Sequence, residues 1–281
     1  MTGHPPEWSD AAWCERQYNP RLTVADAGDI LAGWAQQASA SRTRLAPVTD
    51  LRYGAHPRAL YDLFRVDDAK GLIIFLHGGY WRALSKTEHS WVADVLVPAG
   101  YSVAVVNYPL CPEVAIDMIA DHCRAAVAHI WQTASPAEQH RCLVAGHSAG
   151  GYLTAAMFAT VWEPYGLPAT PFCGGLAISG VFDPTPLICT SINELIRLTP
   201  QSAASLDLTL HPRRVAAPLI FAVGGDEPEE FHRQSRDMAA AWRIDASAVH
   251  SIAGTNHFSV AAQLAEPSSP VATLALRLLS G

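Results

Sequence analysis

Several features that would assign this sequence to a functional class are absent from it. Lysine and arginine form no cluster, and 19 basic against 26 acidic residues give a formal net charge of −7, so we expect no nucleic-acid partner. No apolar run reaches membrane-spanning length, and the first eight residues, MTGHPPEW, lack the basic start and apolar core of a secretory signal. These absences predict a cytoplasmic protein without a membrane partner.

Patterns typical of metal sites and disulfides are missing as well. The six cysteines show no C-x-x-C spacing, and the 12 histidines form no H-x-x-x-H or His/Cys grouping with the spacing of metal ligands. In a chain of this length without a signal peptide, scattered cysteines are expected to be reduced thiols. The sequence therefore predicts neither a metal site nor another cofactor.

What the sequence does contain is enough apolar material for a large core. Hydrophobic residues make up 49% of the 281 positions and charged residues 16%, which is typical of a globular protein. Apolar runs of strand length alternate with helix-compatible stretches, and this predicts an α/β protein with a mostly parallel central sheet and helices on both faces. The predicted strands are an antiparallel hairpin at 51–53 and 59–64, then 71–76, 101–106, 141–145, 174–178, 218–223 and 248–252; the predicted helices between and after them are 88–98, 114–131, 151–160, 191–198, 229–242 and 271–279.

The domain organisation follows from the lack of a linker. No Pro/Gly/Ser-rich stretch divides the series, so residues 1–281 are predicted to form a single domain. Residues 1–45 are predicted to be an N-terminal helical extension, broken at Tyr18-Asn19-Pro20. Residues 181–212 are irregular in pattern and are a candidate cap or lid. The sequence does not fix the oligomeric state, which leaves a homodimer open.

The stretch Gly146-His147-Ser148-Ala149-Gly150 carries the first chemical signal. It has the Gly-x-Ser-x-Gly pattern and lies between a predicted strand and a predicted helix. A sharp strand-to-helix turn holds the serine in strained backbone geometry and brings neighbouring chain close, which glycine on both sides permits. Ser148 is therefore the candidate nucleophile, with the backbone amide of Ala149 beside it at a helix N-terminus.

The loop after the first parallel strand carries paired glycines, Gly78 and Gly79. Paired glycines let backbone amides approach a bound oxygen closely. The amides of Gly78 and Gly79 are therefore candidates for an oxyanion hole, together with the amide of Ala149. Tyr80 and Trp81, which follow, fit two interpretations: packing at the rim, or aromatic walls that bind a planar substrate.

A hydrolytic serine also needs a histidine and a carboxylate, and two further strand ends supply them. His257 follows the last predicted strand, and the loop after 218–223 holds both Asp226 and Glu227. A carboxylate there fixes the histidine tautomer and stabilises the imidazolium. Such loops commonly place the acid three residues after the glycine that ends the strand, which favours Glu227 and leaves Asp226 as the alternative. Asp183, after another strand, is predicted to be a loop or cap residue.

Four segments together resemble the serine-dependent kynurenine formamidase (arylformamidase) branch of the α/β-hydrolase superfamily. They are HGGYW at 77–81, NYPLCP at 107–112, GHSAGG at 146–151 and EFHRQS at 230–235. The resemblance implies an α/β-hydrolase fold over nearly the whole chain. It also implies a small-molecule substrate, N-formyl-L-kynurenine, hydrolysed without metal to formate and kynurenine in tryptophan breakdown.

The same residues leave two other functions open. A carboxylesterase acting on short acyl esters would use the same Ser148, Glu227 and His257. A ligand-binding protein without catalytic activity could be built on the same scaffold. A strong preference for an ester over the formamide would favour the first alternative, and failure of Ser148 to react with a fluorophosphonate would favour the second.

Overall fold

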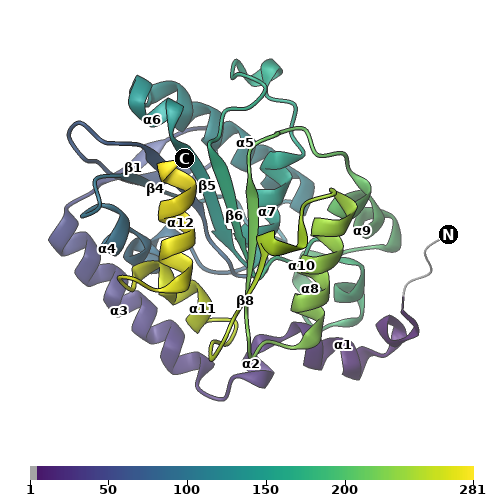
Figure 1. The fold of residues 1–281 in the computed structure, drawn as a ribbon. Helices are drawn as coiled ribbons and strands as arrows, with labels where there is room; N and C mark the ends of the chain where they lie inside the picture. The colour runs from purple at the N-terminus through teal and green to yellow at the C-terminus, as the bar shows by residue number, and fades with distance from the viewer. Residues whose placement is uncertain (1–4) are drawn as a thin grey trace.

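The structure of the chain is a computed structural model that describes residues 5–281. Residues 1–4, which are part of the stretch expected to lack a secretory signal, lie outside the described residues. An eight-stranded sheet runs through the molecule in the order β1-β2-β4-β3-β5-β6-β7-β8 (Figure 1). Within the described residues, no helix is both long enough and apolar enough to cross a bilayer.

The sheet is antiparallel at one edge and parallel elsewhere. β1 pairs with β2 in antiparallel sense, with Leu51 opposite Tyr61, so the predicted hairpin is confirmed. β2 is antiparallel to β4, and every pair from β4 to β8 is parallel. The carboxyl ends of the parallel strands therefore meet along one edge, where ligands bind in sheets of this kind. The strands are β1 (Val48–Arg52), β2 (Leu60–Phe64), β3 (Leu72–Leu76), β4 (Ser102–Val106), β5 (Cys142–His147), β6 (Gly174–Ile178), β7 (Leu219–Gly224) and β8 (Val249–Ile252).

Helices cover both faces of the sheet, as predicted (Figure 1). The strand β3 shows why two cores form: Leu72, Ile74 and Leu76 belong to one buried cluster, whereas Ile73 and Phe75 belong to the other. Side chains alternate across a strand, so a strand that is apolar at every position needs cover on both sides. One cluster includes residues of α5 (Ile116–Thr133), α7 (Ala149–Phe158) and α10 (Glu229–Ala241); the other includes residues of α3 (Ala27–Leu45), α4 (Ala93–Leu96), α11 (Ser259–Ala262) and α12 (Pro270–Ser280).

The predicted helices at 88–98 and 191–198 are wrong in extent. The first is a short 3-10 turn followed by the four residues of α4. The second ends early because Arg197 adopts a left-handed φ of 54°, and Thr199, extended before Pro200, caps a separate helix. The helices concerned are α8 (Asn193–Ile196) and α9 (Pro200–Leu206). Three short helices were not predicted: α6 (Pro136–His140), α9 and α11.

The N-terminal helices cross the edge at which the parallel strands end (Figure 1). The break predicted at Asn19 is confirmed, because α1 (Ala11–Tyr18) stops there and the Asn19 side chain accepts a hydrogen bond from the backbone N–H of Arg21 in α2 (Pro20–Thr23). Tyr18 belongs to one core cluster and Trp34 of α3 to the other. The extension therefore packs on both sides of the molecule and passes over the strand ends between them.

Candidate active site

Ser148 lies between β5 and α7, at the carboxyl end of a central parallel strand. Its φ of 55° and ψ of −117° are the strained geometry that the sequence predicts for this turn. The turn also depends on its glycines: a Cβ on Gly146 would lie 2.2 Å from the carbonyl oxygen of Gly150, and one on Gly150 would lie 1.9 Å from that of Leu76. Any larger residue at these two positions would displace the backbone that holds Ser148.

The carboxylate that meets the histidine is Glu227. Its Oε2 lies 2.6 Å from Nδ1 of His257, and the two side chains are 0% and 3% exposed. The other carboxylate oxygen accepts hydrogen bonds from the Ser179 hydroxyl and, at 2.7 Å, from the backbone N–H of Gly224. Because Glu227 is acceptor-only when ionised, His257 carries its proton on Nδ1 and leaves Nε2 unprotonated to serve as a base.

The alternative acid, Asp226, lies elsewhere. Its side chain is exposed, and its backbone N–H donates to the carbonyl of Thr255 at 2.9 Å. Asp183 is a loop residue, as predicted; its carboxylate accepts from the backbone N–H of Thr185 at 2.9 Å. The geometry therefore brings one of the two adjacent carboxylates, Glu227, to the histidine.

Three backbone amides near Ser148 are available to a bound oxygen. The loop at Gly78 lies against the serine turn, since a Cβ there would be 3.0 Å from the carbonyl oxygen of His147 and 3.3 Å from Cβ of Ser148. Within residues 5–281, the N–H groups of Gly78, Gly79 and Ala149 have no hydrogen-bond acceptor. Unpaired amides next to a nucleophile are the arrangement that an oxyanion hole needs.

A cavity of about 210 Å³ opens onto both Ser148 and His257. Tyr80 forms part of its wall, held by a hydrogen bond from its hydroxyl to the backbone carbonyl of Tyr18. Most of the remaining wall was not predicted, because it is built from segments that lie far apart in the sequence. These wall residues come from the N-terminal extension, from the segment 181–212 and from the His257 loop. They are Asn19, Pro20, Leu31, Trp34, Ile192 and Phe258.

Trp81 does not reach this cavity, so its interpretation as a substrate wall is wrong. Its side chain is fully buried, and its indole packs edge-on against Tyr152 with the ring centroids 5.3 Å apart. Tyr80 and Trp81 both have positive φ, 48° and 55°, and their ring planes lie at 70° to each other, so the two rings do not form one flat wall. Trp81 therefore packs in the core rather than at the rim, whereas Tyr80 lines the cavity.

Three buried histidines pack beside the site, one of them directly against His257. His147 lies against His257 with ring centroids 4.7 Å apart, and its Nε2 donates to the backbone carbonyl of His257 at 2.8 Å. His77 stacks on Tyr108 at 4.1 Å and on His89 at 5.5 Å. One ring nitrogen of each of these three histidines has no partner in residues 5–281, and no group of three His, Cys, Asp or Glu side chains in that range could hold a metal ion.

Burial of these rings predicts a loss of stability in mild acid. Burial lowers the pKa of His77, His89 and His147, that of His89 to about 4. An unfolded histidine has a pKa near 6.5, so below that pH the unfolded chain binds protons that the folded chain does not bind. The contribution of these rings to the free energy of unfolding is fully present above about pH 6.5. As the pH drops toward 4, the free energy of unfolding falls by at most about 4 kcal/mol per pH unit for three such groups.

Urea denaturation at pH 7, 6 and 5 measures this slope. His89→Gln removes one of the three groups, so its slope between pH 6 and 5 is expected to be shallower by about 1.4 kcal/mol per pH unit. Equal slopes for wild type and variant would contradict the assignment of the acid sensitivity to these buried rings.

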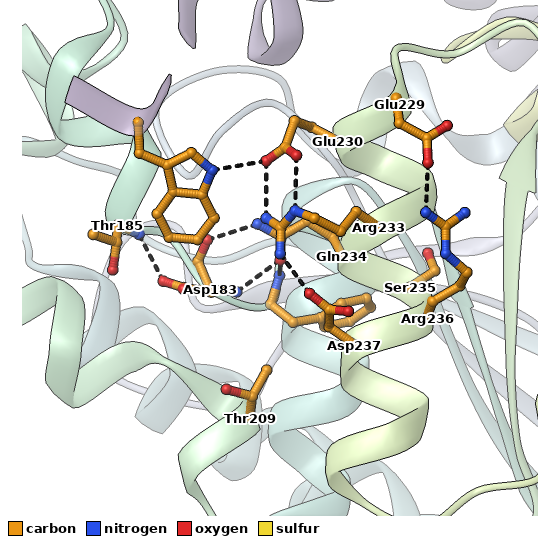
Figure 2. Close-up of polar contacts among 12 residues, drawn as sticks. Asp183, Thr185, Thr209, Glu229, Glu230, Arg233, Gln234, Ser235, Arg236 and Asp237 are labelled. Carbon is orange, nitrogen blue, oxygen red and sulfur yellow. Dashed lines mark hydrogen bonds and ion pairs between the residues drawn. The ribbon is translucent and has the colours of Figure 1, made fainter. Parts of the chain in front are cut away.

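A buried carboxylate on α10 anchors the N-terminal extension. Glu230 accepts hydrogen bonds from the Trp8 indole at 3.1 Å and the Tyr18 hydroxyl at 2.6 Å, and both of its oxygens accept from Arg233. Figure 2 shows Arg233 between Glu230 and Asp237 on the same helix. Burial raises the pKa of Glu230, but the hydrogen bonds from Arg233, Tyr18 and Trp8 outweigh it, so the pKa is lowered and the carboxylate stays ionised.

This anchor predicts a large and local effect of substitution. Glu230→Ala removes the buried acceptor that Trp8, Tyr18 and Arg233 share and leaves Arg233 only the exposed Asp237, so it is expected to lower the free energy of unfolding by about 3 kcal/mol. Glu229→Ala is the matched control, because Glu229 is the neighbour of Glu230 on the helix but makes only an exposed ion pair, with Arg236 (Figure 2). This substitution should lower the free energy of unfolding by less than about 1 kcal/mol. Urea denaturation compares the two, and similar losses would contradict the anchoring role.

Comparison with known proteins agrees with this fold and site. Residues 73–185 match the family described as alpha/beta hydrolase fold. The crystal structure of a candidate thioesterase from Silicibacter sp. TM1040 is similar with a TM-score of 0.83, at 30% sequence identity, covering 94% of this chain and 97% of that one. The chain belongs to the α/β-hydrolase family.

Among curated proteins, the chain is similar to kynurenine formamidases. The Danio rerio protein is 25% identical over 283 residues, which cover 97% of this chain and 94% of that protein. The Salmo salar protein is 30% identical over 217 residues, or 74% of this chain and 72% of that protein. The family resemblance carried by the four sequence motifs is thereby confirmed.

Proposed function

We propose that this protein is a serine hydrolase that cleaves N-formyl arylamides, with N-formyl-L-kynurenine as the substrate. The observation that carries the proposal is the buried Glu227–His257 hydrogen bond beside a cavity that Ser148 and His257 share. The similarity to kynurenine formamidases over 97% of the chain supports the choice of substrate.

The first half of the reaction forms a formyl-enzyme. Ser148 Oγ attacks the formyl carbon while its proton passes to Nε2 of His257. The amides of Gly79 and Ala149, with Gly78, hold the oxyanion, and Glu227 stabilises the imidazolium. The C–N bond then breaks as His257 gives its proton to the arylamine nitrogen, leaving the formyl group esterified to Ser148.

The second half regenerates the serine. Water attacks the formyl ester as His257 takes its proton, and formate leaves when the proton returns to Ser148. Every proton moves through one imidazole, so these steps use no cofactor.

Specificity then lies with the leaving arylamine, because the formyl group has no substituent to recognise. Tyr80, Trp34 and Phe258 give the cavity aromatic walls of the kind that bind a planar ring. Residues 1–45 and 181–212, which contribute Trp34 and Ile192, act in this proposal as the cap over the site.

Hydrolysis of N-formyl-L-kynurenine and of p-nitrophenyl acetate tests the proposal. The ester is intrinsically the more reactive compound, so a higher kcat/KM for the formamide reflects recognition by the site rather than reactivity. Ser148→Ala provides the background rate. A strong preference for the ester would instead favour an esterase, the second candidate.

A further inference from the structure

One guanidinium in the cavity, that of Arg82, has no hydrogen-bond or ion-pair partner among residues 5–281. Arg82 lies three residues after Gly79, its side chain is half-buried, and it lines the cavity that contains Ser148 and His257. Among the arginines of residues 5–281, every other half-buried side chain donates a hydrogen bond to the protein. Those six are Arg42, Arg58, Arg124, Arg141, Arg213 and Arg233.

Other donors occupy Glu15, the acid on which the charge of Arg82 acts. The Glu15 carboxylate accepts hydrogen bonds from the Asn19 amide at 2.7 Å and from the hydroxyl and backbone N–H of Ser191 at 2.6 and 2.8 Å. Those donors fix Glu15 in place and leave the N–H groups of Arg82 open. Arg21, exposed on α2, adds a second positive charge to the same cavity wall.

We propose that Arg82, with Arg21 beside the same cavity, binds a carboxylate of the substrate. A planar guanidinium matches a carboxylate with two parallel hydrogen bonds, and a partly buried one binds it more strongly than a solvated one does. The inference rests on the proposed function: a formyl group carries no substituent, so the carboxylate belongs to the arylamine that leaves. The substrate class becomes N-formyl arylamines bearing a carboxylate.

Two substrates that differ only in this charge test the subsite: N-formylkynurenine and its carboxamide. Wild type is expected to prefer the carboxylate by roughly 10- to 100-fold in kcat/KM, the range for one charge-assisted hydrogen-bonding group. Arg82→Gln should abolish the preference for the carboxylate, while its kcat/KM for the carboxamide should stay within about threefold of the wild-type value. Arg82→Lys should retain part of it, and Arg65→Gln, an exposed arginine outside this cavity, should retain all of it.

A second pair, 4-acetoxybenzoate and 4-acetoxybenzamide, separates the subsite from the proposed reaction. If the formamides are inert but the charged ester is preferred and Arg82→Gln removes that preference, the subsite stands and the formamidase proposal falls. If the formamides are cleaved with no preference for the carboxylate, the formamidase proposal stands and the subsite is overturned. An Arg82→Gln variant that slows both members of a pair equally would also overturn the subsite.

Discussion

Ser148→Ala is expected to lower kcat for any acyl substrate by roughly 10⁴-fold or more, because alanine has no oxygen to form the acyl-enzyme. The fold should persist, since the substitution removes one oxygen that makes no hydrogen bond within the described residues. The oxyanion amides of Gly79 and Ala149 are unchanged in this variant. Steady-state kinetics together with a thermal melt measure activity and folding on the same preparation.

His257→Gln provides the matched comparison for Ser148→Ala. The two residues act on one proton, so the double variant should be about as inactive as either single variant rather than multiplicatively worse. Retention of more than about 1% of wild-type kcat in Ser148→Ala would contradict the assignment of the nucleophile.

The second large effect separates the two adjacent carboxylates. Glu227→Gln keeps the shape of the buried side chain but can present an N–H to Nδ1 of His257, which favours the wrong imidazole tautomer. A fall in kcat of roughly 10³- to 10⁴-fold is expected at neutral pH. Asp226→Asn removes the same formal charge from an exposed side chain and should change kcat by less than about threefold.

Measured side by side, these two variants control for net charge and for position in the loop. Equal losses would mean that the loop, rather than the Glu227–His257 hydrogen bond, governs activity. A larger loss for Asp226→Asn would require a rearranged loop in which that carboxylate reaches the histidine.

The parts of the molecule that could be predicted from sequence are those fixed by local pattern and strand-end position. Apolar runs located the parallel strands, and the loops after them contain Gly79, Ser148, Glu227 and His257. The choice of Glu227 over Asp226 as the carboxylate nearer His257 followed from its spacing after Gly224, and the structure brings that residue to Nδ1.

The parts that could not be predicted depend on contacts between distant segments. Trp34 and Arg82 line one cavity only because the N-terminal extension crosses the strand ends, and neither position carries a local signal of this. The sequence could not decide between the two interpretations of Trp81, because two successive positive φ angles, which no glycine marks, turn its ring into the core. Ser179 supports Glu227 from the end of β6, and only its strand-end position could have pointed to it.

Reaction with a fluorophosphonate, followed by mass spectrometry of the peptides, tests the central claim most directly. The reagent forms a P–O bond to an activated serine and loses fluoride. The account predicts one adduct, at Ser148, formed much more slowly in Glu227→Gln than in Asp226→Asn. Folded protein that stays unlabelled, or an adduct at another residue with Ser148 unmodified, would contradict the claim that Ser148, His257 and Glu227 form a working nucleophilic site.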